Sequence, residues 1–126
     1  MVVVIHRGNH LHTPFWAWKK PRKVPLHTTI KQVLSAEDIQ NMSVSDIYDV
    51  IKKEFEYDDY KYQKENNILI TEKDRAEKIH KILYKCPHCQ TERKMNSSGT
   101  EVYCEECGKR WNLNEDGTLS AINGET

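Results

Sequence analysis

Four cysteines are the residues whose types and spacing most clearly define a chemistry in this chain. They form two Cys-x-x-Cys pairs, Cys86 with Cys89 and Cys104 with Cys107, separated by 14 residues. Such pairs present four thiolates at the spacing that tetrahedral zinc requires. Because four thiolates leave no coordination position for a water molecule, the pattern predicts one structural zinc ion. Free or redox-active thiols are the alternative interpretation.

Residues beside the two pairs add detail to this prediction. His88 lies between two of the cysteines and could replace one as a ligand, although we expect a solvated side chain. Gly108 follows the second pair, at a turn position that often requires a positive φ. Gln90 occupies the matching position after the first pair.

The segment around the cysteines, residues 84–124, has the strand pattern of a small all-β zinc ribbon. Expected strands at 91–95 and 100–104 flank the turn signal 96–99, and a second pair at 110–113 and 118–121 flanks the turn signal 114–117. We expect a small core over the metal, made of Met95, Val102, Trp111 and Leu113. A core of this size needs the ion in order to fold.

Composition limits what the rest of the chain can be. The 126 residues include 19 basic and 19 acidic side chains, and hydrophobic residues make up 37%. This supply of apolar residues is small for one large domain, and a net charge of zero gives no general attraction to nucleic acid or anionic lipid. No apolar run approaches the about 20 residues of a membrane-spanning helix, and no signal peptide is present. We therefore expect a cytoplasmic protein, at most peripheral to the inner face of the membrane.

The elements before the ribbon read as strand, loop, strand and helices. Residues 2–5 are apolar throughout, which predicts a buried strand of a parallel sheet, and alternation over 24–30 predicts a half-buried strand. Ser43 and Asp46 form a capping box that opens a helix. The apolar face of that helix consists of Val44, Ile47, Tyr48, Ile51 and Phe55.

Closer to the cysteines the pattern is weaker. Residues 57–67 have no clear state, and residues 68–70 suggest a short strand. Thr71 and Asp74 form a second capping box, which predicts a linking helix over 71–83. Its apolar side would carry Ala76, Ile79, Ile82 and Leu83.

The loop after the first strand is rich in histidine and basic residues: His6, Arg7, Asn9, His10 and His12. Loops at the carboxyl ends of strands are where α/β folds bind ligands, and histidines there can bind metal or transfer protons. Solvated histidines are the alternative. His10 does not complete the Asn-His-x-x-x-x-Asp motif of glycerolipid acyltransferases, because Phe15 occupies the aspartate position. We therefore assign no catalytic residue.

An aromatic and basic segment follows this loop. It consists of Phe15, Trp16, Trp18, Lys19, Lys20, Arg22 and Lys23. Such a mixture suits contact with an anionic membrane surface, where aromatic rings settle at the headgroups and cations meet phosphates. It also suits stacking on single-stranded nucleic acid. The third interpretation is that the aromatic rings cover an edge of the core while the cations are solvated.

Three segments and the trailing ribbon together resemble one protein family. The segments are residues 3–10 (Val-Val-Ile-His-Arg-Gly-Asn-His), 23–26 (Lys-Val-Pro-Leu) and 57–60 (Tyr-Asp-Asp-Tyr). The chain is similar to the C-terminal part of bacterial lysophosphatidic acid acyltransferase-like proteins that carry a C-terminal zinc ribbon. The resemblance implies an α/β acyltransferase domain at the cytoplasmic membrane that transfers an acyl group from a thioester to a glycerophospholipid acceptor.

The catalytic histidine and aspartate of that family, and its Pro-Glu-Gly-x-Arg motif, have no counterpart in this sequence. The expected fold is therefore an α/β remnant over 1–70, a linking helix over 71–83 and a zinc ribbon over 84–124. The expected function is the C-terminal portion of a phospholipid-synthesising acyltransferase, inactive alone, whose partner is the missing catalytic part. Two alternatives remain: a stand-alone ribbon that binds nucleic acid or a protein partner, with nucleic acid disfavoured by the neutral charge, and a structural or inhibitory protein that binds only zinc.

Overall fold

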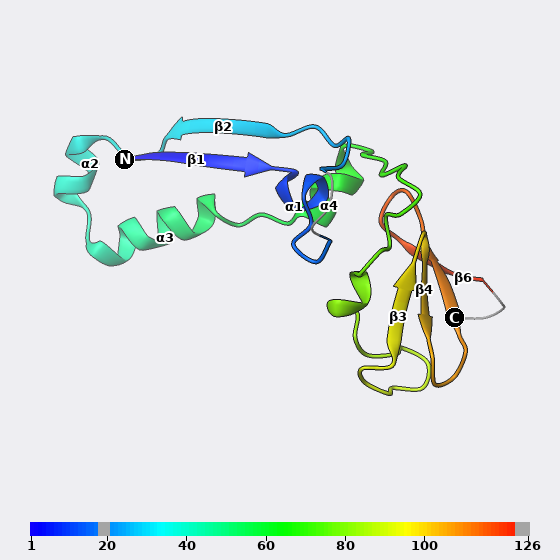
Figure 1. Ribbon diagram of the computed structural model, residues 1–126. Helices are drawn as coiled ribbons and strands as arrows, with labels where there is room; N and C mark the ends of the chain where they lie inside the picture. The colour runs from blue at the N-terminus through cyan, green and yellow to red at the C-terminus, as the bar shows by residue number, and fades with distance from the viewer. Residues whose placement is uncertain (18–20, 123–126) are drawn as a thin grey trace.

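The computed structural model describes residues 1–17 and 21–122, which form two small antiparallel sheets connected by short helices and turns (Figure 1). An elongated arm contains the first two strands and two helices. The four remaining strands form a separate sheet at the other end of the molecule. The mixture of strands and helices and the C-terminal antiparallel sheet agree with the expected fold class at this coarse level.

The arm is built on a two-stranded sheet. Strand β1 (Val2–Arg7) pairs antiparallel with β2 (His27–Gln32), with Val2 opposite Gln32 and Arg7 opposite His27. The prediction of a parallel, doubly buried strand is wrong, because Val3 is buried while Val2 and Val4 remain 57% and 48% exposed. The second strand starts three residues later than expected, and Val24 is buried outside it.

Two helices complete the arm. Helix α2 (Ala36–Asn41), which the sequence analysis did not predict, begins with a capping box between Ser35 and Asp38. Helix α3 (Val44–Glu54) begins as predicted, because the Ser43 hydroxyl accepts a hydrogen bond from the Asp46 amide at 3.2 Å. Its predicted apolar face has little cover: Val44, Tyr48 and Phe55 are 85%, 61% and 59% exposed.

Two further helices lie where the arm meets the second sheet. Helix α1 (Asn9–His12) adjoins α4 (Asp59–Glu65), whose first amides are capped by the Asp58 carboxylate. Beside them is a small buried cluster of Leu11, Val24, Ile68 and Ile70. Residues 68–70 do not form the expected strand, although the Ile70 amide donates to the Glu115 carbonyl at 2.8 Å.

The predicted linking helix over 71–83 does not form. This segment consists of turns and a single 3₁₀ turn, η1 (Ile79–Lys81). Lys78 has a left-handed conformation with φ of 65°, which interrupts a helix. The Ala76 amide donates at 2.9 Å to the carbonyl of Gly99, in a turn of the second sheet, so this amide does not bond within the segment. The expected apolar residues Ala76 and Ile79 are nevertheless buried.

The second sheet has the order β3 (Met95–Ser98), β4 (Glu101–Cys104), β5 (Arg110–Leu113) and β6 (Leu119–Ala121). The last three strands lie at or within one residue of their predicted positions. The first does not: the hairpin turns at Gly99 and Thr100, so that 96–98 lie in the strand and not in the turn.

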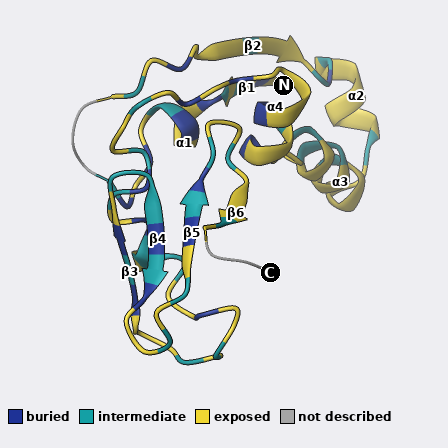
Figure 2. Ribbon diagram, turned by 90° about the vertical axis from the view of Figure 1, so that its right-hand side faces the viewer, coloured by how far each residue is buried: buried dark blue, intermediate teal, exposed yellow. Residues whose placement is uncertain are grey.

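The core of the second sheet extends beyond its own strands. Met95, Val102, Trp111 and Leu113 are buried, as predicted. Segments earlier in the chain contribute Trp16, Ala76 and Ile79 to the same cluster. Figure 2 shows that β2, α2 and α3 are mostly exposed, so burial is concentrated at the ribbon end of the protein.

We predict that Gly8→Ala destabilises the protein more than Gly99→Ala. Both glycines have positive φ, +82° and +62°, which costs a residue with a side chain about 1–2 kcal/mol. A Cβ at Gly8 would also lie 2.8 Å from the Pro25 carbonyl oxygen, whereas at Gly99 the nearest atom is 3.6 Å away. Overpacking of this kind costs about 1–3 kcal/mol more. The measurement is urea unfolding followed by circular dichroism, and equal losses in the two variants would contradict the prediction.

Candidate metal centre

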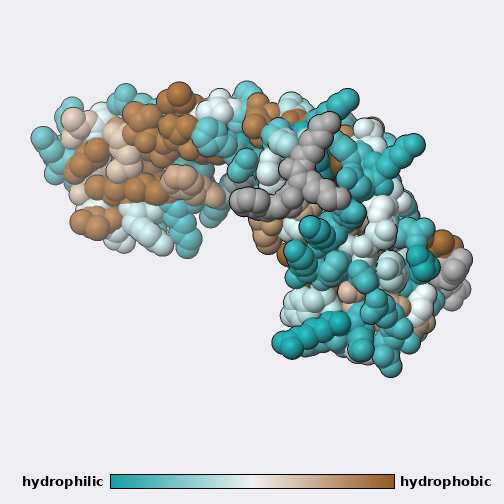
Figure 3. Space-filling view, in the orientation of Figure 1, coloured by the Kyte–Doolittle hydropathy of each residue, from teal (hydrophilic) through white to brown (hydrophobic). Residues whose placement is uncertain are grey.

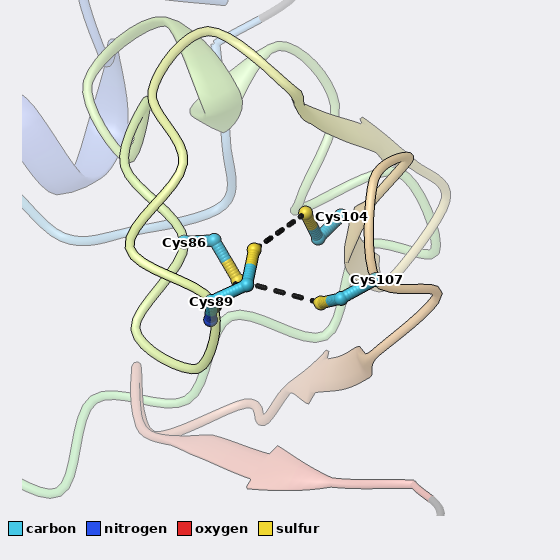
Figure 4. A group of neighbouring side chains, drawn as sticks. All are labelled: Cys86, Cys89, Cys104 and Cys107. Atoms are coloured by element: carbon cyan, nitrogen blue, oxygen red, sulfur yellow. Dashed lines mark hydrogen bonds between the residues drawn. The ribbon is translucent and has the colours of Figure 1, made fainter.

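The four predicted cysteines lie together at one end of the ribbon (Figure 4). Their sulfur atoms are all within 4.8 Å of one another. The Cys86 and Cys107 sulfurs are 3.7 Å apart, as are those of Cys89 and Cys104, so each close pair joins the two halves of the motif. Cys86 and Cys104 are fully buried, and Cys89 and Cys107 are half-buried. This arrangement could hold one metal ion.

Two matching turns position the sulfurs. The Gln90 amide donates to the Cys86 carbonyl and the Gly108 amide donates to the Cys104 carbonyl, both at 3.0 Å. Gly108 has the positive φ predicted for it, 72°, and Gln90 adopts a similar φ of 61° in spite of its side chain. The side-chain amide of Gln90 donates to the Pro87 carbonyl at 2.9 Å. A non-glycine residue is thus held in the left-handed conformation by its own turn.

The turns are anchored to the sheet from both sides. Cys104 ends β4, and the Glu105 amide beyond it donates to the Lys94 carbonyl at 2.8 Å. Before β3, the Cys86 amide donates to the Thr91 carbonyl at 3.0 Å, which closes the loop that carries the first pair. Backbone hydrogen bonds therefore anchor the turns that carry both cysteine pairs.

Two of the thiols have pKa values shifted in opposite directions. Hydrogen bonds from the side chain and backbone of Thr91 lower the pKa of Cys89 to about 6. At Cys107 a backbone hydrogen bond from Lys109 lowers the pKa, but desolvation and the other three sulfurs outweigh it and raise that pKa to about 11. Cys89 thus loses its proton easily, whereas Cys107 keeps its own proton because its neighbours are sulfur atoms.

The histidines of the sequence lie outside this cluster. His88 is exposed, as expected, and is not among the grouped ligand atoms. The amino-terminal histidines make separate contacts: the His6 ring is 2.9 Å from the Thr28 hydroxyl, and the His12 ring is 2.7 Å from the Thr13 hydroxyl. Within residues 1–17 and 21–122, the four cysteines are the only group with metal-binding geometry.

The structure reveals a polar cluster that the sequence analysis missed. The Asp59 carboxylate is 8% exposed and accepts hydrogen bonds from the amides of Gly8 at 3.0 Å and His10 at 3.2 Å. It also accepts the Tyr57 hydroxyl at 2.6 Å. Desolvation, and to a smaller extent this hydrogen bond, raise the pKa of Tyr57 to about 12. Two of the segments that carry the family resemblance, 3–10 and 57–60, thus meet at one carboxylate.

The aromatic and basic segment divides between core and surface. Phe15 is 62% exposed, but Trp16 is buried with the ribbon core at 7% exposure, which corrects its assignment to a membrane contact. Arg22 is half-buried and its side chain donates to the Arg75 carbonyl at 2.8 Å, so this residue stabilises the fold. Lys23 is exposed, although its amide donates to Glu72. Trp18, Lys19 and Lys20 lie outside the described residues.

Comparison of the chain with protein-family models, with curated proteins and with solved structures found no match. In the described part of the chain, no helix is long and apolar enough to cross a membrane.

Proposed function

We propose that Cys86, Cys89, Cys104 and Cys107 bind one zinc ion, and that its function is structural. The observation that carries the proposal is the spacing of the sulfur atoms. Zinc–sulfur bonds of about 2.3 Å in a tetrahedron place neighbouring sulfurs about 3.8 Å apart. Two of the sulfur pairs here are 3.7 Å apart. Soft thiolates favour zinc over the hard cations magnesium and calcium.

A structural role fits the small size of the ribbon. Its strands are three or four residues long, and a sheet this short buries too little apolar surface to fold unaided. Four thiolates from two separate turns would fill the coordination shell, so a bound ion would cross-link the turn before β3 to the turn after β4 without offering a position for substrate.

We predict one zinc per chain, which Cys104→Ser releases and His88→Ala retains. Loss of one of four thiolates weakens a structural site strongly, whereas the exposed imidazole of His88 makes no contribution. Elemental analysis of protein purified without chelator gives the stoichiometry, and cobalt substitution reports tetrahedral thiolate coordination through its visible spectrum. Iron in place of zinc, or full zinc retention by Cys104→Ser, would contradict the proposal.

For the whole chain we propose a wider role as the C-terminal portion of a glycerophospholipid acyltransferase. The resemblance of three segments and the ribbon to that family supports this proposal. The apolar surface of the arm favours it as well, because Val2, Val4, Ile30, Val44 and Phe55 are 48% to 85% exposed. Figure 3 shows hydrophobic side chains gathered on the arm. An apolar surface of this kind suits packing against another part of a larger α/β domain. In this proposal the catalytic histidine and aspartate belong to that other part.

We predict that this chain alone does not transfer acyl groups from acyl thioesters to lysophosphatidic acid. His10 has no aspartate five residues later, and its amide is engaged by Asp59 in the fold. The assay is release of thiol from acyl-CoA, with the parent, His10→Ala and the neighbouring His12→Ala as a matched control. Turnover that His10→Ala alone abolishes would contradict the prediction. Coding DNA upstream of Met1 without an in-frame His-x-x-x-x-Asp would contradict the wider proposal.

We also propose a membrane contact, now centred on Phe15. Its ring is exposed and makes edge contacts with His10 and with Trp16, which hold it at the surface. Lys23 is a cation close to Phe15 in the sequence. Its side chain is exposed and can bind an anionic headgroup. Trp16 contacts the Phe15 ring and is itself buried.

We predict weak binding to anionic vesicles that decreases with salt and with Phe15→Ala. One basic residue near an anionic surface is worth about 1 kcal/mol, and salt screens that attraction. Phe55→Ala is a matched control, since Phe55 is exposed to a similar extent at 59% but lies at the end of α3. The measurement is co-sedimentation with vesicles of anionic or neutral lipid. Equal binding of Phe15→Ala and the parent, or preference for single-stranded nucleic acid, would contradict the proposal.

A further inference from the structure

Helix α3 carries a stripe of apolar side chains that the rest of the protein leaves exposed. The stripe consists of Val44, Tyr48 and Ile51, and of Phe55 at the end of the helix. At 3.6 residues per turn, these four positions fall within about 60° of one another around the helix axis. Val44, Tyr48 and Phe55 are 85%, 61% and 59% exposed, and Ile51 is half-buried. Figure 3 shows hydrophobic side chains at the surface over α3, and exposed apolar patches of this kind mark interaction sites.

The stripe is separate from the side of α3 that faces its own sheet. Glu54 forms an ion pair with Lys31 of β2 at 2.7 Å, which identifies that side. Ile47 and Val50 lie on the same side of the helix as Glu54 and are half-buried. The exposed members of the stripe project in a direction about 100° away from it. The packing of α3 on its own sheet therefore does not account for the stripe.

The spacing of the stripe is the same in both directions along the helix. Its members are separated by four, three and four residues, which is the spacing of a coiled-coil seam. When two copies of α3 lie antiparallel, Val44 of one copy is level with Phe55 of the other. Tyr48 is level with Ile51 in the same arrangement. A twofold-symmetric contact requires such a self-complementary surface, so the spacing favours a second copy of this chain over an unrelated partner.

The charges of α3 favour the same antiparallel arrangement. The first half of the helix carries Asp46 and Asp49, and the second half carries Lys52 and Lys53. Glu54 is already engaged in its ion pair with β2. Within residues 1–17 and 21–122, Asp49, Lys52 and Lys53 form no ion pair. Two antiparallel copies bring the acidic half of each helix opposite the basic half of the other, whereas parallel copies bring like charges together.

We propose that α3 binds α3 of a second copy of this chain, antiparallel and about a twofold axis. The apolar stripe forms the centre of the contact, and Asp49 of each copy lies opposite Lys52 of the other. A contact of about three helical turns is smaller than the about 800 Å² per partner of a standard interface, so the dimer is weak. The inference does not depend on the acyltransferase proposal, because the apolar side chains of the strands lie outside this contact.

The test is sedimentation equilibrium of the full zinc-loaded chain between about 1 μM and about 1 mM. We expect a monomer at the lower concentrations and a dimer at the higher ones. Tyr48→Lys places two like charges beside the twofold axis and should keep the chain monomeric throughout this range. Ile30→Lys is the matched control and should dimerise as the parent does, since Ile30 is an apolar residue of β2 that is 71% exposed. A parent that stays monomeric at about 1 mM, or equal dimerisation of the two variants, would overturn the proposal.

A charge exchange tests the orientation of the two helices without disturbing the apolar stripe. Asp49→Lys and Lys52→Asp each place like charges opposite one another and should weaken the dimer about tenfold. The double variant restores opposite charges across an antiparallel contact, so its affinity should return close to that of the parent. Circular dichroism verifies that each variant keeps the fold of the parent. If the double variant dimerises no better than the single variants, the antiparallel contact is wrong and the proposal fails.

Discussion

Four sulfur atoms within 4.8 Å of one another cannot all carry a negative charge unless a cation lies among them. At Cys107 desolvation and the other three sulfurs raise the pKa to about 11, whereas at Cys89 hydrogen bonds from Thr91 lower it to about 6. A divalent cation removes this restriction, because thiols that coordinate a metal are deprotonated outright. The backbone already holds both cysteine turns in place, so the ion would enter a prepared site. The turn that carries Cys104 and Cys107 also joins β4 to β5.

The ribbon is also part of a larger packed unit. The Glu115 carbonyl, in the turn before β6, accepts hydrogen bonds from the Ile70 amide at 2.8 Å and from Gln63 at 3.3 Å. The Arg75 guanidinium donates to the Leu113 carbonyl at 2.6 Å, and Trp16 is buried in the ribbon core. Loss of a bound ion would therefore loosen these earlier segments as well as the ribbon itself.

Local rules made the cysteine cluster, the start of α3 and strands β4 to β6 predictable. Cys-x-x-Cys spacing, a serine cap and turn residues act over a few positions, so they hold whatever surrounds them. The helix expected over 71–83 had a good cap and good spacing, but Lys78 is left-handed and the Ala76 amide bonds to Gly99 across the molecule. The position of Trp16 could not be predicted, because composition does not distinguish an aromatic ring that packs on a core from one that contacts a membrane. The Asp59 cluster joins residues about 50 positions apart, which no local pattern reveals.

The arm and the ribbon differ in how they are stabilised. A two-stranded sheet is marginal alone, and the arm adds to it only two helices with no buried residue. The Lys31–Glu54 ion pair at 2.7 Å ties β2 to α3, but its lysine is 54% exposed, and such pairs contribute little. Val44 and Ile30 are the most exposed of the arm's large apolar side chains, at 85% and 71%. The arm therefore gains most from a surface that covers it, whereas the ribbon has a buried core and a cysteine cluster of its own. This asymmetry makes the arm the part of the molecule with the least apolar surface buried.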